Sequence, residues 1–141
     1  MAAFLLDTNV ISELVRPRPD PRVLTFVRRA IDPWLSSITL HELAYGAERS
    51  PDPARKAKLN GWIAGIASEF SGRIIVVDGE IAELSGRLRA LAAAQGRPAS
   101  ALDALIAGSA QISGLNLATR NTKDFEALGI TTVDPWADPA T

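Results

Sequence analysis

The fold of this chain is decided by residues 4–13, FLLDTNVISE. An apolar run that stops abruptly at Asp7 indicates a buried strand that delivers one charged side chain to the edge of a sheet. Apolar residues then recur at helical spacing, at positions 10, 11, 14 and 15, so the chain turns directly from strand into helix with Asp7 or Thr8 as the N-cap. We expect the same order of strand, acid and helix to recur along the chain.

The length and composition predict one compact domain. A chain of 141 residues can build one core but is short for two, so we expect residues 1–141 to form a single domain with an irregular tail at 134–141. No apolar stretch approaches the roughly 18–20 residues of a membrane span, and the first residues lack the pattern of a signal peptide. We therefore expect a cytoplasmic protein with no membrane contact.

The scarcity of nitrogen and sulfur ligands restricts any metal chemistry. The chain has no cysteine and one histidine, His41, which excludes thiolate and multi-histidine sites and leaves oxygen as the ligand. A net charge of −1 argues against a surface that binds nucleic acid over its whole area. Basic residues do gather in two segments, which we interpret as solvated helix faces: Arg16, Arg18, Arg22, Arg28 and Arg29, and then Arg55, Lys56 and Lys58.

Strands alternate with helices along the chain. The patterns predict helices over 20–31, 39–49, 53–70, 80–95 and 100–113, a short helix through 125 and 128, and further strands at 34–38, 74–77, 115–119 and 130–133. We expect Ile31 and Leu91 to face the core and the strand at 74–77 to be covered on both faces. This order predicts a three-layer α/β/α domain around a parallel sheet of four or five strands.

Acidic residues follow several of these strands. Because parallel strands leave a sheet at one edge, Asp7, Glu42 and the pair Asn121 and Asp124 should emerge together. Asp103 opens the helix that precedes the strand at 115–119, so its helix begins at the same edge. Thr39 with Glu42, and Ser100 with Asp103, also match the capping box that starts a helix.

Helix capping explains each acid singly, since a carboxylate in a first helical turn gains about 0.3–1 kcal/mol from the helix dipole. It does not explain their convergence, because gathered carboxylates repel one another unless a cation neutralises them. Oxygen ligands of this kind suit Mg²⁺ or Mn²⁺, which can activate water for phosphodiester hydrolysis. We interpret Asp78 as a turn residue and Glu13 as a residue behind the site.

Other catalytic patterns are missing from the sequence. No Ser-His-Asp order or nucleophile elbow surrounds His41, which we interpret as a partly exposed helix residue. No glycine-rich dinucleotide or P-loop motif is present.

Four segments in this order resemble PIN-domain ribonucleases, specifically the VapC/FitB-like toxins of type II toxin–antitoxin pairs: residues 5–13, 39–46, 103–107 and 118–125. The resemblance implies a Mg²⁺-dependent endoribonuclease that cleaves RNA, forms a homodimer and is neutralised by a VapB-like antitoxin. It assigns metal binding and catalysis to Asp7, Glu42 and Asp103.

The resemblance also suggests supporting residues. Thr8, Asn9 and Thr119 match positions that orient ligands or water. Some members carry Asp where this chain has Asn121, and we favour Asp124 as the fourth acid because a capping Asn121 would bring both side chains to one helix end.

Two alternatives compete with this reading. A phosphotransfer domain of the HAD or receiver type also places an Asp after its first strand, but the HAD motif has a second Asp two residues later, where this chain has Asn9. The other alternative is a non-catalytic PIN-like binding module, in which the acids only cap helices or dock a protein.

Overall fold

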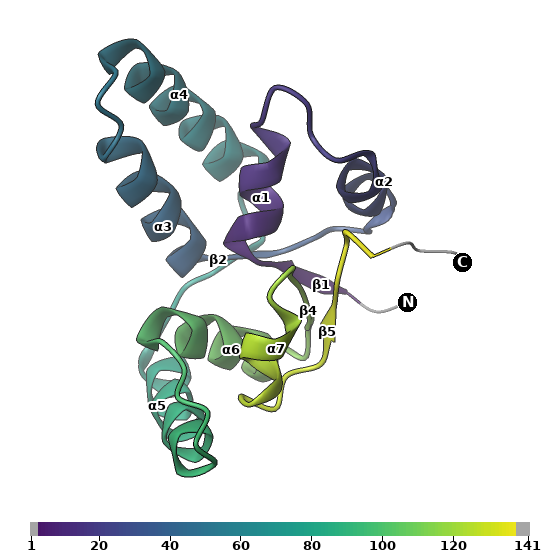
Figure 1. Ribbon diagram of the computed structural model, residues 1–141, viewed down its shortest axis with the longest axis vertical. Helices are drawn as coiled ribbons and strands as arrows, with labels where there is room; N and C mark the ends of the chain where they lie inside the picture. The colour runs from purple at the N-terminus through teal and green to yellow at the C-terminus, as the bar shows by residue number, and fades with distance from the viewer. Residues whose placement is uncertain (1–2, 138–141) are drawn as a thin grey trace.

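The computed structural model describes residues 3–137, in which short parallel strands lie between two layers of helices (Figure 1). One set of strands has the order β1-β4-β5 and the other pairs β2 with β3. Their bounds are β1 Phe4–Leu6, β2 Leu35–Ser36, β3 Ile74–Ile75, β4 Asn116–Ala118 and β5 Thr132–Val133. A parallel bridge between Leu5 and Trp34 joins the two sets, so β1 lies at the centre of five strands.

The helices divide between the two faces of the strands. Figure 1 shows α1 to α4 on one side and α5 to α7 on the other. Their bounds are α1 Thr8–Leu14, α2 Pro21–Arg29, α3 Ser37–Glu48, α4 Pro53–Glu69, α5 Gly79–Ala94, α6 Ala101–Ser113 and α7 Thr122–Glu126. Among the described helices none is long and apolar enough to cross a membrane.

The alternation of side chains along β1 builds two cores. Leu5 packs into a cluster with residues of α5, α6 and α7, such as Leu88, Ile106 and Phe125. Leu6 points the opposite way, into a cluster with residues of α1 to α4, such as Ile11. Since consecutive strand residues face opposite sides of a sheet, a fully apolar strand requires helices on both faces. The expected three-layer α/β/α arrangement with a parallel sheet is confirmed.

The start of α3 corrects one prediction. We expected this helix to begin at Thr39 with a capping box, but it begins at Ser37, and the Ser36 hydroxyl accepts a hydrogen bond from the backbone N–H of Ile38 at 3.1 Å. Ser36 can act as the cap because the strand ends there, two residues earlier than predicted. Thr39 is consequently an interior residue of the helix and fully buried, and Glu42 lies in the second helical turn rather than the first.

Three predictions of core residues are wrong. Ile31 is 59% exposed because α2 ends at Arg29 and the chain turns through Asp32, whose φ is +47°. Val76 is 70% exposed because β3 ends at Ile75, at the edge of the sheet. Leu91 is 59% exposed because α5 buries the small Ala92 instead. Each of these residues lies either at the end of a helix or strand or at the margin of the apolar face of a helix. At such positions the spacing of apolar residues does not decide whether a side chain is buried.

The chain after β5 has neither helix nor strand over residues 134–137. Trp136 is buried in this stretch, packs into the cluster that contains Leu6, and has the guanidinium of Arg120 4.9 Å from its ring centroid. Residues 138–141 of the predicted tail lie outside the described residues.

Candidate metal centre

Asp7 occupies the junction of the central strand β1 with α1. Its side chain is the N-cap of α1, with Oδ1 accepting from the backbone N–H of Thr8 at 2.8 Å. Oδ2 accepts from the hydroxyl of Thr119 at 2.7 Å and from the amide of Asn9 at 3.4 Å. Thr119 reaches it because β1 and β4 pair in register, with Leu6 opposite Ala118. Residue 7 is only 5% exposed, so the strand delivers a carboxylate into the interior of the site.

Glu42 is joined to the same junction through Thr8. The Thr8 hydroxyl donates to Glu42 Oε1 at 2.6 Å and lies 3.2 Å from the hydroxyl of Thr39. Helix capping does not explain Glu42, because the helix has already completed its first turn before this residue. The sequence reading missed Thr39 as part of this network, although its spacing of three residues from Glu42 places both on one helix face.

Asp103 lies in the first turn of α6, where the hydroxyl of Ser100 accepts from its backbone N–H at 3.1 Å. The expected cap at Ser100 is therefore confirmed. Burial raises the pKa of Asp103 above its ordinary value, the hydrogen bond from Ser100 lowers it, and the charges of Glu42 and Asp124 raise it further. Asp103 thus shares its electrostatic environment with two of the other predicted acids.

The pKa of Asp7 completes this connection. Burial raises the pKa to about 6, hydrogen bonds from Thr119 and Thr8 oppose the rise, and the charges of Asp103 and Glu42 add to it. Desolvation and like charges both disfavour an ionised carboxylate. The four acids predicted from sequence therefore act on one another, directly or through Asp103, as a single region of negative potential.

The β4–α7 turn corrects a second prediction. Asn121 precedes α7 but makes no side-chain capping bond, because its backbone is not in the extended conformation that a capping side chain needs. The turn is held instead by Thr119, whose hydroxyl accepts from the backbone N–H of Asn121 at 3.0 Å. Asp124 is exposed on the same turn, and both side chains line one shallow hollow.

The donor set fits a hard divalent cation. Carboxylate and hydroxyl oxygens converge on the β1–α1 junction, and the chain offers no thiolate. In residues 3–137 no three acids or histidines already stand in metal-binding geometry. Burial is the main reason that the pKa values of Asp7 and Asp103 are raised, and the charges of the neighbouring acids add to it, so a bound cation would stabilise both ionised carboxylates.

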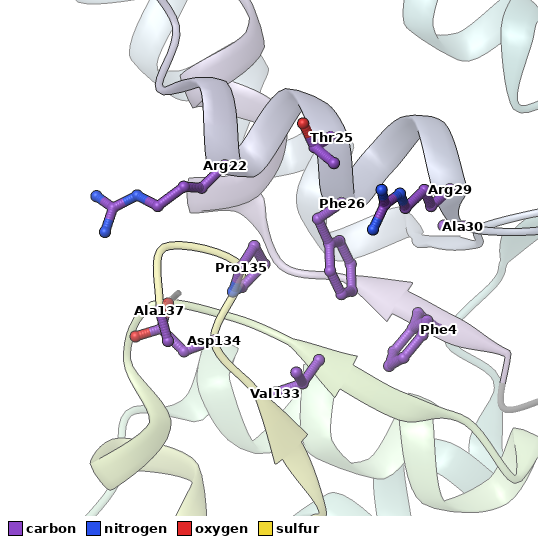
Figure 2. A pocket seen from close by; sticks show the side chains of 10 residues that line it. All are labelled: Phe4, Arg22, Thr25, Phe26, Arg29, Ala30, Val133, Asp134, Pro135 and Ala137. Atoms are coloured by element: carbon purple, nitrogen blue, oxygen red, sulfur yellow. The ribbon is translucent and has the colours of Figure 1, made fainter. Parts of the chain in front are cut away.

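A separate hollow of about 380 Å³ lies away from these acids, between α2 and the end of β5 (Figure 2). Its walls are largely apolar, and Phe4 and Phe26 meet edge to face at 5.0 Å between ring centroids. Arg22, Arg29 and Asp134 supply its charged groups, and the Asp134 carboxylate already accepts from the backbone N–H of Trp136. None of the four clustered acids lines this hollow, so it is not the candidate metal centre.

The fold and the site together define an α/β domain with acids at the carboxyl ends of its parallel strands. The family model described as the PIN domain matches residues 4–130, and the chain therefore belongs to the PIN-domain family. The resemblance found in the sequence is confirmed, and the phosphotransfer alternative is set aside.

Two characterised relatives are similar over almost their full length. Toxin FitB of Neisseria gonorrhoeae is 36% identical over 138 residues, covering 96% of this chain and 99% of that protein. The tRNA(fMet)-specific endonuclease VapC of Shigella flexneri is 35% identical over 137 residues, covering 97% of this chain and 100% of that protein. The similarity therefore includes the whole acidic region and not one motif alone.

Solved structures give the same picture. The crystal structure of FitAcB from Neisseria gonorrhoeae superposes with a TM-score of 0.89 at 36% identity, covering 96% of this chain and 99% of that one. The crystal structure of DNA-bound VapBC from Salmonella typhimurium superposes with a TM-score of 0.73 at 33% identity, covering 96% of this chain and 99% of that one.

Proposed function

We propose that this protein is a Mg²⁺-dependent endoribonuclease, the toxin of a type II toxin–antitoxin pair, and that Mn²⁺ can replace Mg²⁺. The observation that carries the proposal is Asp7, a carboxylate buried at the centre of the sheet and coupled electrostatically to Glu42 and Asp103. A helix cap needs no burial, so capping alone leaves this placement unexplained. Similarity to FitB and to the VapC endonucleases supports the activity.

The proposed roles of the residues are supported by their contacts and by their electrostatic interactions. Asp7, Glu42 and Asp103 would hold the cation through their carboxylates, and Asp124 would help to position it or its water. The hydroxyls of Thr119 and Thr8 orient the first two carboxylates by donating to them. When bound, the cation supplies charge stabilisation and an activated water for cleavage of the phosphodiester bond.

Asn9 and Thr119 stabilise the position of Asp7 through hydrogen bonds. The amide of Asn9 lies 3.4 Å from Asp7 Oδ2 and 3.3 Å from the Thr119 hydroxyl, and its carbonyl oxygen accepts from the backbone N–H of Arg120 at 3.4 Å. This chain of contacts ties the end of β4 to the start of α1. The hydrophobic cluster that contains Leu6 and Ile11 supports the backbone on both sides of Asp7 before any ligand binds.

The proposed partner is a VapB-like antitoxin in the cytoplasm, with the toxin itself a homodimer. Solved relatives include FitAB and VapBC complexes. A cluster of carboxylates is suited to blockage by an inserted arginine, whose planar fork pairs with carboxylates. Replacing that arginine of the cognate antitoxin with alanine should speed dissociation or restore cleavage, and a complex that stays silent and equally long-lived would place the inhibition elsewhere. Light scattering that shows only a monomer at micromolar concentration would contradict the homodimer.

Cleavage of RNA in the presence and absence of divalent cation tests the activity. The purified protein should cleave in Mg²⁺ or Mn²⁺, stop when a chelator is added, and resume when the cation is restored. A protein that binds RNA or protein partners but cleaves nothing in either cation would be a binding module. Sequencing of the RNA ends after induction identifies the substrate.

A further inference from the structure

An aromatic and basic surface leads away from the acids along α3. Glu42, Tyr45 and Arg49 are spaced three and four residues apart, which places them on one face of the helix and its end. Arg55 of α4 lines the same surface. We call Tyr45, Arg49 and Arg55, with His41 at the inner end, the α3 track.

Two adjoining hollows make this surface continuous with the candidate metal centre. The first is lined by His41, Glu42, Tyr45 and Leu102, and Leu102 directly precedes Asp103. The second is lined by Tyr45, Arg49 and Arg55 among others. Because Tyr45 lines both hollows, it lies between Glu42 on one side and Arg49 and Arg55 on the other.

The Tyr45 side chain presents its ring to solvent. It is 59% exposed, an unusual exposure for a large aromatic residue beside a buried site. The guanidinium of Arg49 lies 5.4 Å from the ring centroid, and its Nη1 donates to the Tyr45 hydroxyl at 3.4 Å. The ring and the cation are thus held together as a unit that offers a stacking surface and positive charge at once.

The charges of the track remain available to an anion. Within the described part of the chain, neither Arg49 nor Arg55 forms an ion pair with an acid. Asp52, the acid that lines the second hollow, is committed as the N-cap of α4, with Oδ1 accepting from the backbone N–H of Ala54 at 3.1 Å. For a chain with a net charge of −1, this is a local concentration of cations next to the acids.

We propose that the α3 track binds the single-stranded RNA next to the scissile phosphate, with a nucleobase stacked on Tyr45 and backbone phosphates on Arg49 and Arg55. The proposal rests on the proposed function, since it extends the same site. Unpaired bases can stack on an aromatic ring, whereas the bases of a duplex cannot reach it. Interspersed cations and an aromatic ring favour RNA over an apolar peptide helix. Tyr45 is in this account a positioning residue for the substrate.

Binding and cleavage of a fluorescein-labelled pool of random 12-nucleotide single-stranded RNA test the proposal. Tyr45→Ala should raise KM about tenfold and leave kcat within about twofold, because stacking acts on binding. Tyr45→Phe keeps the ring and should behave like wild type. Arg49→Ala should lower the slope of log affinity against log salt by about 0.7, as expected for one lost phosphate contact on a single strand. Arg87→Ala, an exposed arginine on α5, is the matched control and should change neither quantity.

The experiment separates this proposal from the nuclease assignment, because anisotropy measures binding in the Asp7→Asn protein without cleavage. Tyr45-dependent RNA binding without any cleavage by wild type would retain the track and reject the nuclease. Unchanged KM and unchanged RNA affinity in Tyr45→Ala, with the melting temperature of wild type, would overturn the track. A Tyr45→Ala effect confined to dimer formation or to antitoxin affinity would also overturn it, as would equal affinity for the duplex form of the pool.

Discussion

Two junctions of this molecule are built on the same local pattern and have different properties. At the β1–α1 junction Asp7 ends an apolar strand and caps the next helix through the backbone N–H of Thr8. At the β3–α5 junction Asp78 lies three residues after the end of β3 and also caps the next helix, with Oδ1 accepting from the backbone N–H of Ile81 at 2.9 Å. Asp7 is 5% exposed and hydrogen-bonded by Thr119, whereas Asp78 is exposed.

The difference arises from the position of the two strands in the sheet. β1 has neighbours on both sides, so the ends of β2 and β4 and the helices that follow them surround Asp7. β3 lies at the edge, and few elements cover its end. A carboxylate after a strand therefore becomes a candidate ligand at the centre of a parallel sheet and a simple helix cap at its margin.

The largest expected effect is on cleavage. Asp7→Asn should lower the cleavage rate at least about 10³-fold, equivalent to ~4 kcal/mol, because asparagine keeps the shape and the cap but loses the charge that holds the cation. Asp103→Asn should have a comparable effect. Asp78→Asn is the matched control and should cleave within about twofold of wild type. If Asp7→Asn and Asp78→Asn cleaved RNA at similar rates, the two junctions would not differ in function as proposed.

Substitutions at Asp7 and Asp78 should change the free energy of unfolding in opposite directions. Because the pKa of Asp7 is raised to about 6, its contribution to stability is fully present below its ordinary pKa of 3.8 and is lost as the pH rises through about 6. Asp7→Asn removes this loss, so without divalent cation at pH 7 it should raise the free energy of unfolding by about 1–3 kcal/mol. Asp78→Ala should lower it by about 1 kcal/mol through the lost cap.

Urea unfolding at pH 4 and pH 7 measures both effects. The stability of wild type should fall between these pH values more than that of Asp7→Asn. The prediction fails if Asp7→Asn is destabilised at pH 7 and retains the pH dependence of wild type.

Thr119 is the contact that separates Asp7 most clearly from Asp78. Thr119→Val keeps the side-chain shape but removes the hydroxyl that donates to Asp7 at 2.7 Å, so Mg²⁺ affinity should fall about tenfold. Loss of that bond also raises the pKa of Asp7, which should move the acid limb of the pH–rate profile to higher pH. Thr119→Ser keeps the hydroxyl and should retain the profile of wild type; if Thr119→Val does so too, the hydroxyl does not orient Asp7.

The smallest expected effect on the cleavage rate concerns Asp124. Its side chain is exposed like that of Asp78, but it follows β4, which has a neighbouring strand on each side. Asp124→Asn should lower the rate about tenfold at limiting Mg²⁺, equivalent to ~1.4 kcal/mol, and added Mg²⁺ should partly restore it. The melting temperature should change little. Asn121→Ala, which removes no capping bond, should keep both the rate and the melting temperature. If Asp124→Asn cleaved at the normal rate but had a lowered melting temperature, Asp124 would only stabilise α7, and the cation site would consist of Asp7, Glu42 and Asp103.

Much of the fold was predictable from the chain because its strands are short apolar runs between amphipathic helices. The layers, the parallel sheet and the N-cap at Ser100 followed from hydrophobic spacing and capping chemistry, whereas the first N-cap was narrowed only to Asp7 or Thr8. The start of α3 did not, since Ser36 and Thr39 are both suitable caps and only the length of β2 decides between them. The exposure of Val76 was also unpredictable, because the order of strands sets which strand lies at the edge.

The candidate acids of the site were easier to select from the sequence than the contacts around them. Asp7 and Glu42 were selected as candidates because each follows a predicted strand, and Asp103 because its helix begins at the same edge of the predicted sheet. The link from Thr8 to Glu42, which joins α1 to α3, connects residues 34 positions apart and depends on the packing of two helices. For the same reason Thr39 was assigned to a cap although it is buried beside that link.

Titration of Mn²⁺ into the purified protein by calorimetry tests most directly the claim that Asp7 and Asp103 belong to one cation site. Wild type and Asp78→Asn should bind with the same affinity and stoichiometry, and Asp7→Asn and Asp103→Asn should each lose that binding while remaining folded. At pH 6 wild type should also release protons on binding, since Asp7 is partly protonated there. Binding of Mn²⁺ by Asp7→Asn with the affinity and proton release of wild type would contradict the account.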